Sequence, residues 1–427
     1  MHLLLGPMTL FCLALHPAAA GDTGAADRRV LESHCALPCE WRALDLVTGH
    51  GGVQGIATGG GLVLAAGNAF SDEKPAFVAA LNADGHIAWR FSGGHKRGAV
   101  SAKLFGVAAD GEGGAIAVGE DPLLQRKDSS NSPVPRAAWL LRLDPQGALL
   151  WQLHLRPGMH FPAAAGQERV GNGRFVDVAG DGAGGFVVLG YWQEADRIRP
   201  WVLRLAGDGR VLWEHLFEGS GWNYPQAIAV DEAGVAVTGR DSPPAALADL
   251  WLARLSLDGA LLWQRLYGGP DADAGSAVFL AGDGRTAVFG STGGFRHRSE
   301  NAARGWSFMV DPNGTVEEEW VAPPEGPQSL SAIGGQEAGR LMALDPVLPL
   351  RAELVLMAPA RQILARAPLD FPELDPRYSK IQGMAVDAAA QRVYLAIDAR
   401  LPRATGSGFP VPMVVAYAIP GLFGTGQ

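Results

Sequence analysis

The stretch WLLRLDPQGALLW, residues Trp139–Trp151, returns several times along the chain. Near-copies begin at Trp201 and Trp251, and more diverged copies begin at Phe77 and Trp306. Each copy reads as a β-hairpin, with an aromatic and branched first limb, a short polar turn and a second limb. The turn ends in glycine because that residue accepts the positive φ that closes it. This repetition predicts an architecture built from several copies of one hairpin unit.

A second hairpin precedes each copy, as in residues 106–119 and 176–190. Ala and Gly dominate its first limb, which suits an innermost strand where strands crowd around an axis. Two hairpins per unit give a four-stranded sheet, and such a sheet is a propeller blade. The predicted fold class is therefore all-β: a β-propeller of four-stranded antiparallel blades. A pair of β-sandwiches or a solenoid would not explain copies that share one tryptophan and glycine frame.

Seven blades are predicted, with six or eight as the alternative. Two fainter units follow the five clear ones, at residues 339–364 and 383–417. The last unit lacks an outermost strand, whereas residues 40–46 precede the first blade without a hairpin partner. We expect that N-terminal strand to complete the last blade and to close the ring, because closure removes exposed sheet edges. Residues 39–427 are then a single propeller domain.

The N-terminus has the features of a secretory signal peptide. Residues 3–15 are mostly apolar, and Ala18-Ala19-Ala20 supplies small residues before a cleavage point at Gly21. The apolar run is too short to span a bilayer, so residues 1–20 are predicted to be removed, with no membrane span afterwards. A secreted or periplasmic location follows from this prediction.

Once Cys12 leaves with the signal peptide, two cysteines remain: Cys35 in the N-terminal segment, residues 21–38, and Cys39 directly after that segment. An even number of cysteines in an oxidising compartment favours a disulfide, which is predicted between these two. Two free thiols are the alternative. A metal or haem site would need further ligands nearby.

Composition limits the partners of this chain of 427 residues. Its formal net charge is −9 and it has no long basic run, so nucleic-acid binding is disfavoured. Apolar residues make up 48% of the chain, which fits a globular protein and disfavours disorder. A protein or a carbohydrate, in the envelope or outside the cell, is the expected partner.

The hairpin sequence resembles the repeat of bacterial extracytoplasmic β-propeller proteins, including quinoprotein-like families. Residues 80–89, ALNADGHIAW, are similar to the outer hairpin of those families, and the other copies are nearer to a W-L-x-R-L-D-x-x-G-x-x-L-W repeat. The resemblance covers nearly the whole mature chain and implies the propeller fold, with the tryptophans packed between blades. It implies little about activity, because propellers host many unrelated functions. No cofactor is predicted, and pyrroloquinoline quinone (PQQ) or a metal ion is the alternative.

Binding is expected on the face that carries the long connections between hairpins and between blades, because long loops on a rigid scaffold often carry function. The aromatic residues Trp222, Tyr224 and Tyr378 lie in these connections and could stack on a sugar or a peptide. Plugging of the funnel mouth is their alternative role.

Basic residues in the same connections could bind a carboxylate, sulfate or phosphate group. The candidates are Arg97, Arg169, Lys103 and Arg174. Solvation of the surface is the alternative role of these side chains.

Three histidines, His50, His95 and His160, lie in the connections that enter the first three predicted blades. Imidazoles from adjacent blades could converge on a metal ion. Three unrelated loop histidines are the alternative, because no short ligand spacing supports the group. The glycine-rich turns at Asp110 and Gly180 are shorter than a calcium loop and are interpreted as tight turns.

The sequence contains no familiar catalytic motif: no G-x-S-x-G, no H-E-x-x-H and no phosphate-binding loop. We therefore predict a binding or scaffold protein that recognises a protein or a glycan through its loop-rich face. A quinone- or metal-dependent propeller enzyme is one alternative. A structural component of envelope assembly is the other.

Overall fold

The computed structural model shows an all-β protein, which confirms the fold class predicted from the repeats. The chain divides into a unit Met1–Leu31 and a unit Glu32–Gln427, and all described residues belong to the second. The predicted signal peptide, residues 1–20, and the segment 21–38 lie outside the described residues. In the described ranges no helix has the length and apolarity needed to cross a bilayer. The structure describes residues 39–44, 46–47, 50–70, 73–97, 100–122, 136–157, 172–194, 196–218, 221–293, 303–323, 330, 333–334, 341–345, 353–358, 362–369, 379–400 and 410–419.

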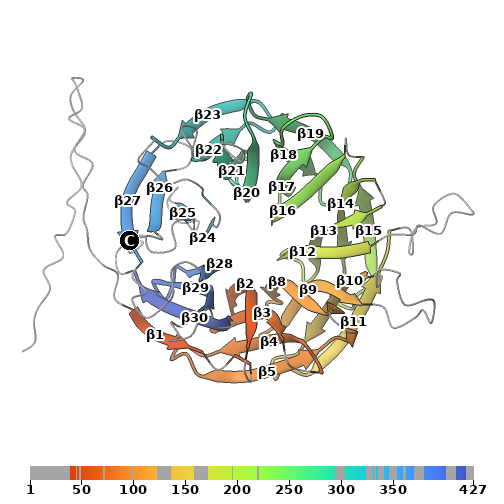
Figure 1. Ribbon diagram of the computed structural model, residues 1–427, viewed down its shortest axis with the longest axis vertical. Coiled ribbons are helices and arrows are strands. Elements are labelled where there is room, and N and C mark those ends of the chain that lie inside the picture. Colours follow the sequence, from red (N-terminus) through yellow and green to blue (C-terminus); the bar gives the residue numbers. More distant parts are fainter. Residues whose placement is uncertain are drawn as a thin grey trace, which may run out of the picture. The chain divides into compact units, whose positions relative to one another are not determined.

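The described strands form four-stranded antiparallel sheets, which we number as blades 1 to 7 in chain order (Figure 1). Blade 1 consists of β2 (Gly51–Gly59), β3 (Leu62–Ala69), β4 (Ala76–Leu81) and β5 (Ile87–Gly93). Blade 2 consists of β8 (Lys103–Ala109), β9 (Ala115–Pro122), β10 (Arg136–Leu143) and β11 (Leu149–Leu155). Blade 3 consists of β12 (Asn172–Gly180), β13 (Phe186–Gln193), β14 (Ile198–Leu205) and β15 (Val211–Leu216). Blade 4 consists of β16 (Trp222–Asp231), β17 (Gly234–Ser242), β18 (Asp249–Leu255) and β19 (Leu261–Tyr267).

The remaining blades follow the same order. Blade 5 consists of β20 (Asp273–Leu280), β21 (Thr286–Thr292), β22 (Arg304–Val310) and β23 (Val316–Val321). Blade 6 consists of β24 (Ile333–Gly334), β25 (Leu341–Asp345), β26 (Glu353–Ala358) and β27 (Gln362–Pro368). Blade 7 consists of β28 (Lys380–Asp387), β29 (Arg392–Ala399), β30 (Val411–Ala418) and the N-terminal β1 (Cys39–Ala43). A small hairpin of β6 (Lys96–Arg97) and β7 (Val100–Ser101) connects blades 1 and 2.

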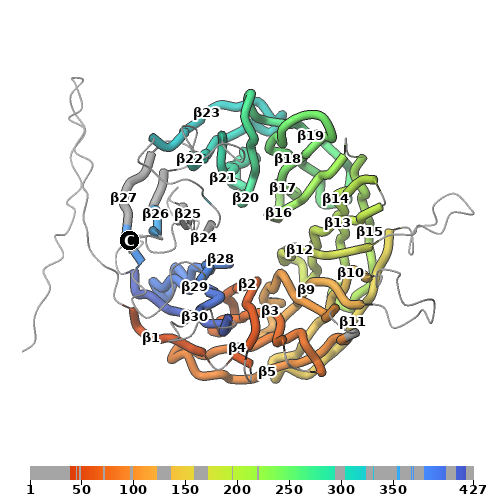
Figure 2. The backbone as a smooth tube through the Cα atoms, in the orientation of Figure 1, coloured from red at the N-terminus to blue at the C-terminus, as the bar shows by residue number. Residues whose placement is uncertain are grey.

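Within the unit Glu32–Gln427, the innermost strands of consecutive blades contact one another (Figure 2). The contacting pairs are β2 with β8, β8 with β12, β12 with β16, β16 with β20, β20 with β24, β24 with β28 and β28 with β2. The sheets therefore succeed one another around a central axis. One parallel backbone pair, Ile198 with Trp222, also joins blades 3 and 4.

The N-terminal strand pairs with the C-terminal one, as the sequence predicts. The β1 strand lies antiparallel to β30, and Arg42 is opposite Val415. The strand is shorter than the predicted residues 40–46, since it runs from Cys39 to Ala43. An ion pair between Arg392 Nε and a Glu40 carboxylate oxygen, 2.6 Å apart, also links β1 to β29.

The outer tryptophan of one blade packs on the turn glycine of the next blade. The ring of Trp41 in β1 lies where a Cβ on Gly85 would be, and its Nε1 donates a hydrogen bond to Ala83 O at 2.9 Å. The same packing recurs for Trp89 on Gly147, Trp151 on Gly209, Trp213 on Gly259 and Trp263 on Gly314. Each of these glycines has a positive φ, so any other residue would be both strained and blocked. Since Trp41 repeats the contact, β1 is equivalent to the outermost strand of the other blades.

A one-residue bulge interrupts the innermost strand of blades 1 to 5 and 7. In blades 1 to 5 a glycine of the second strand lies beside the bulge. A Cβ on these glycines would come within 1.8 to 2.2 Å of a carbonyl oxygen of the innermost strand, so only glycine permits the approach. The glycines are Gly67, Gly119, Gly190, Gly239 and Gly290.

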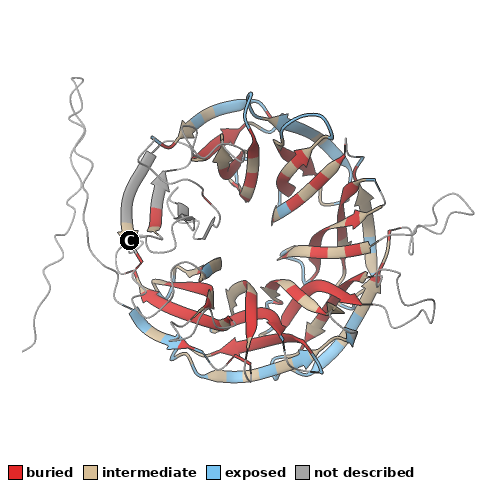
Figure 3. Cartoon of the chain, in the orientation of Figure 1, coloured by how far each residue is buried: buried red, intermediate tan, exposed pale blue. Residues whose placement is uncertain are grey.

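The hydrophobic core lies between blades rather than within them. Between blades 1 and 2, for example, Leu64 and Ala66 of β3 pack with Trp139 and Leu141 of β10. Buried residues fill the inner and middle strands, and exposed residues concentrate on the outermost strands (Figure 3). A single blade would therefore expose one or both of its apolar faces, and the array is stable only as an assembly of neighbours.

The arginine of the W-L-x-R-L pattern ties the inner turn of its own blade to the next blade. Arg142 Nη2 donates to the Asp110 carboxylate at 3.0 Å, and its Nη1 donates to Gly207 O in blade 3 at 2.8 Å. The other oxygen of Asp110 accepts a hydrogen bond from Gly114 N at 2.8 Å. The carboxylate is thus used to close the turn, in agreement with the interpretation of this segment as a tight turn.

Candidate functional site

Several residues predicted to form a site lie outside the described residues: Tyr378, Arg169, His160 and Cys35. Arg97 lies in β6, and the structure describes its backbone only. Cys39 begins β1 and is an exposed free thiol, so the disulfide predicted for it is not present. The predicted residues whose side chains are described are Trp222, Tyr224, His50 and His95, together with Lys103 and Arg174.

Many of the polar and aromatic side chains that could contact a ligand lie at one equivalent position of the blades. It is the pair of residues two places before the bulge, one on the innermost strand and one opposite on the second strand. In successive bulged blades this pair is Gly52 and Asn68, Lys103 and Glu120, Arg174 and Tyr191, Tyr224 and Arg240, Ala274 and Ser291, and Lys380 and Asp398. Because the position is equivalent in each blade, the side chains of blades 2, 3 and 4 come together.

Aromatic rings and guanidinium groups alternate across blades 2 to 4. The Arg174 guanidinium lies 4.5 Å from the centre of the Phe105 ring and 5.6 Å from that of Tyr191. Tyr191 meets the edge of Tyr224, with ring centres 6.1 Å apart, and the Arg240 guanidinium lies 5.0 Å from the Tyr224 ring centre. These distances are typical of cation–π and edge-to-face contacts. We call these five residues the arginine–tyrosine array.

The buried carboxylate of Glu120 holds Arg174 of this array in place. The side chain of Glu120 is 2% exposed; one of its oxygens accepts a hydrogen bond from Arg136 Nη1 at 2.9 Å, and the other accepts one from Arg174 Nε at 2.8 Å. Two guanidinium groups around one carboxylate leave a net positive charge. Charge-assisted hydrogen bonds of this kind hold the guanidinium planes in a defined orientation.

A cavity of about 250 Å³ opens beside Glu120 and both arginines. Its walls also include the amides of Asn172 and Gln193 and the phenol of Tyr191. Burial raises the pKa of Tyr191, so its hydroxyl remains protonated and can donate a hydrogen bond. The cavity thus combines positive charge, amide groups and one phenol in a small volume.

Trp222 and Tyr224 both lie on β16, two residues apart, so their side chains point to the same face of the sheet. Both are half-buried. Trp222 is opposite Ser242, and Tyr224 is opposite Arg240. The sequence thus predicted Tyr224 and Arg174 as site residues, and the structure brings both into the array.

Negative charge lies on the other side of blade 4. Asp241, Asp249 and Asp273 are close enough that, after burial, the charges of Asp273 and Asp241 raise the pKa of Asp249. An anionic ligand would therefore be repelled from this side of blade 4 and attracted to the arginines of blades 2 and 3.

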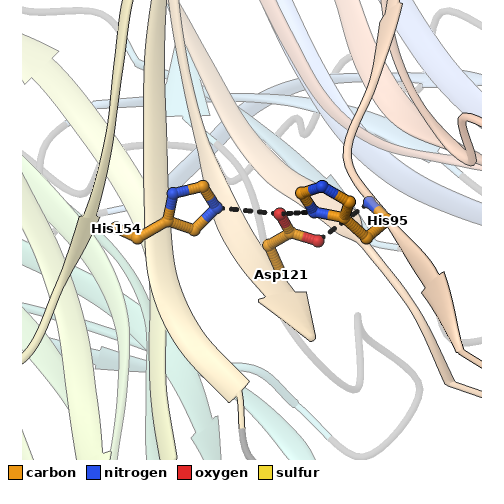
Figure 4. A group of neighbouring side chains, drawn as sticks. All are labelled: His95, Asp121 and His154. Carbon is orange, nitrogen blue, oxygen red and sulfur yellow. Dashed lines mark hydrogen bonds and ion pairs between the residues drawn. The ribbon is translucent and has the colours of Figure 1, made fainter. Parts of the chain in front are cut away.

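Two histidines and one aspartate converge between blades 1 and 2 (Figure 4). His95 follows β5, Asp121 lies near the end of β9, and His154 lies in β11. Asp121 Oδ2 is 2.7 Å from His95 Nδ1 and 2.8 Å from His154 Nε2. Burial alone would raise the pKa of Asp121, but the hydrogen bonds from His154 and His95 outweigh it and lower the pKa. The carboxylate is therefore ionised at neutral pH.

Metal binding by the predicted histidines stays a prediction, and within the described ranges the structure places only one of the three in a cluster of possible ligands. The cluster found among the described residues contains His95 but not His50, and His160 lies outside those residues. His154 was missed, although the repeat contained a signal for it. The residue paired with the first tryptophan of the hairpin is Leu216, Leu266 or Val321 in three blades, and His154 only in blade 2.

Comparison with known proteins shows the fold alone. No family model and no curated protein matches the chain. Among solved structures, the polysaccharide lyase Uly1 is similar with a TM-score of 0.54 and 9% identity, over 86% of this chain and 90% of that one. The β-propeller domain of the Trilobed protease from Pyrococcus furiosus, described as having an open velcro topology, gives 0.49 and 10%, over 86% and 96% of the two chains. The C-terminal WD40 domain of Sif2 gives 0.42 and 10%, over 90% and 99%.

Proposed function

We propose that this propeller is a binding protein for an acidic carbohydrate, held in the cavity between blades 2 and 3. The propeller fold supports a binding or scaffold role in general. The observation that carries the finer proposal is the cavity lining: Arg136 and Arg174 beside the amides of Asn172 and Gln193 and the phenol of Tyr191. A uronic acid presents one carboxylate and several hydroxyl groups, which this combination of donors and acceptors matches.

The charge balance of the cavity favours an anion. Glu120 neutralises only one of the two guanidinium groups that contact it, and its own side chain is buried. The Arg136 side chain is partly exposed, and Glu120 balances its charge only in part. A ligand carboxylate could therefore bind to the nitrogen atoms of Arg136 that face solvent. The ligand charge would complete a four-group arrangement of two cations and two anions.

The size of the cavity favours a sugar unit over a protein surface. A volume of about 250 Å³ is at the low end for ligand pockets and suits one ring rather than a side-chain cluster. The neighbouring rings of Tyr224 and Trp222 on β16 would offer apolar surface to the next sugar of a chain. An acidic glycan outside the cytoplasm is also compatible with the export predicted from residues 1–20.

Binding of a uronic-acid oligosaccharide, compared with a neutral oligosaccharide of equal length, tests the proposal. Isothermal titration calorimetry should detect the acidic ligand only, and its affinity should fall as salt is added. Arg136→Ala removes one charge-assisted hydrogen bond and should weaken binding about tenfold or more. Tyr224→Ala should weaken a longer oligosaccharide more than a single uronic acid.

The control variant is Arg285→Ala, because Arg285 pairs with Asp283 in an exposed turn of blade 5, away from the cavity. It should bind as the wild type does. Equal affinity for acidic and neutral ligands, or no effect of Arg136→Ala, would show that the cavity is not an acidic-carbohydrate site. If the immobilised propeller retains a protein instead of a glycan, and the Arg136→Ala variant does not, the partner is a protein and not a carbohydrate.

A further inference from the structure

We propose that His95, Asp121 and His154 form a binding site for a divalent transition metal ion of the zinc class. The inference is independent of the carbohydrate proposal, because Asp121 and Glu120 are neighbours on β9 and their side chains point to opposite faces of the sheet. The cluster therefore faces blade 1, whereas the cavity faces blade 3.

The ligand atoms are close enough to share one ion. His95 Nδ1, His154 Nε2 and a carboxylate oxygen of Asp121 all lie within 4.8 Å of one another. Metal–ligand bonds of about 2.0 to 2.2 Å in a tetrahedron place ligand atoms roughly 3.3 Å apart. To admit the ion, the two contacts of Asp121, now 2.7 and 2.8 Å, would lengthen toward this spacing, and the two imidazole nitrogens would adjust their separation to it.

The ligand set selects the class of metal. Two imidazole nitrogens and one carboxylate oxygen suit zinc and its neighbours in the first transition row, whereas calcium and magnesium prefer oxygen ligands only. The Asp121 side chain is 1% exposed, but those of His95 and His154 are 42% and 30% exposed. Solvent can therefore supply a fourth ligand, as in zinc sites with three protein ligands and an open position.

The three side chains are held in place by their surroundings. The second oxygen of Asp121 accepts a hydrogen bond from His95 N at 2.9 Å, and His95 O accepts one from Ala102 N at 2.8 Å. The His154 ring stacks on Trp139, with ring centres 6.0 Å apart and planes inclined by 9°. Such outer contacts orient ligands before the metal arrives and lower the cost of binding.

Metal titration of the full chain tests the site. After removal of metal with a chelator, the protein should bind one equivalent of Zn²⁺, measured by calorimetry. Co²⁺ in its place should give the visible absorption of a tetrahedral nitrogen–oxygen site, without a thiolate band. The Cys39→Ser variant should behave as the wild type does, which excludes binding by the exposed thiol.

Three variants locate the ion. His154→Leu places at this position the residue that blades 3 and 4 have there, so it should fold and bind at least tenfold more weakly. Asp121→Asn, which keeps the size of the side chain, should lose binding likewise. His95→Ala changes a partly exposed residue outside the blades and should weaken binding; the metal-free protein should still fold, because Asp121 keeps its hydrogen bonds from His154 and from the backbone N of residue 95.

His86→Ala, at an exposed histidine, is the matched control and should bind as tightly as the wild type. The absence of zinc uptake by the wild type, or unchanged uptake in both His95→Ala and His154→Leu, would overturn the proposal. The cluster would then be a carboxylate that accepts hydrogen bonds from two imidazoles and binds no metal.

Discussion

Asp177 is a carboxylate enclosed between two blades, directly after the bulge of β12. Its two oxygens accept hydrogen bonds from Val178 N at 2.8 Å and from Ile228 N of blade 4 at 3.0 Å. Burial raises the pKa of Asp177 to about 6, because these two hydrogen bonds offset the loss of solvent only in part. The ionised group therefore links blades 3 and 4 at a cost in stability at neutral pH.

Replacing Asp177 by Asn should change how stability depends on pH. Since the folded pKa of about 6 lies above the ordinary aspartate pKa of 3.8, the native state binds an extra proton between these pH values. The resulting stabilisation is complete at low pH and is lost as the pH rises through 6. A pKa that rises from 3.8 to about 6 corresponds to about 3 kcal/mol.

The free energy of unfolding of Asp177→Asn, relative to the wild type, should therefore increase by up to about 3 kcal/mol from pH 4 to pH 7. Urea denaturation at a series of pH values measures this difference. Asp208→Asn, at an exposed turn residue, should show no such trend. A difference between Asp177→Asn and the wild type that stays constant with pH would contradict the raised pKa.

The bulge of the innermost strand depends on the glycine that faces it, and blade 3 allows a direct test. A Cβ on Gly190 would lie 2.2 Å from Arg174 O and 2.9 Å from Phe175 Cα, both backbone atoms. Gly190→Ala should therefore force β12 and β13 apart and lower the free energy of unfolding by about 2 kcal/mol or more. Gly180→Ala in β12, where no atom lies within 4 Å of the added Cβ, is the matched control and should cost less than about 1 kcal/mol. Equal stability of the two variants, measured by thermal denaturation, would show that the strands separate without cost.

The hairpins were predictable from sequence, but the register of the innermost strands was not. The Trp and Gly frame marks the outer hairpins because each ring needs a glycine turn to pack on. The bulge residue follows no single pattern: it is glutamine in three blades, and Phe105, Val176 or Ser276 in the others. An inserted residue shifts the register of every following side chain, so the residue pairs two places before the bulge could not be assigned from the repeat alone. The strand β24 has only two residues and gave no pattern to recognise.

The candidate sites were only partly predictable because they depend on neighbouring blades. Tyr224 and Arg174 were recognised by type, whereas Tyr191 and Glu120 were not recognised as site residues. His154 alternates with the apolar residues of β11. What makes these residues a site is the position they share in adjacent blades, and that position follows from the three-dimensional arrangement.

At the scale of the whole molecule, the pairing of β1 with β30 joins the first described residues to the last. The sequence predicted this pairing from an unpartnered strand before blade 1 and a missing strand in blade 7. Removing residues up to Ala43 would expose the edge of β30 and uncover Gly85. We expect the shortened protein to lose more than about 3 kcal/mol of stability and to associate through the free edge.

Size-exclusion chromatography and thermal denaturation measure both effects. Trp41→Ala, which keeps the strand but removes its contact with Gly85, should cost about 2 kcal/mol and elute at the same volume as the wild type. Trp263→Ala is the comparison, because it removes the same contact between blades 4 and 5. A shortened protein that melts with the wild type and elutes as one species would show that β1 is dispensable.

The sheet shared by the two ends also sets an order of events in time. Synthesis delivers Cys39–Ala43 before the other described strands and Val411–Ala418 after them, so blade 7 cannot be completed until β30 has been made. Until then every partial ring has two unsatisfied sheet borders, and a partly synthesised chain stays short of its native state. Folding of blade 7 therefore waits for β30, and a chain that stops before this strand leaves the borders of the first and last sheets exposed.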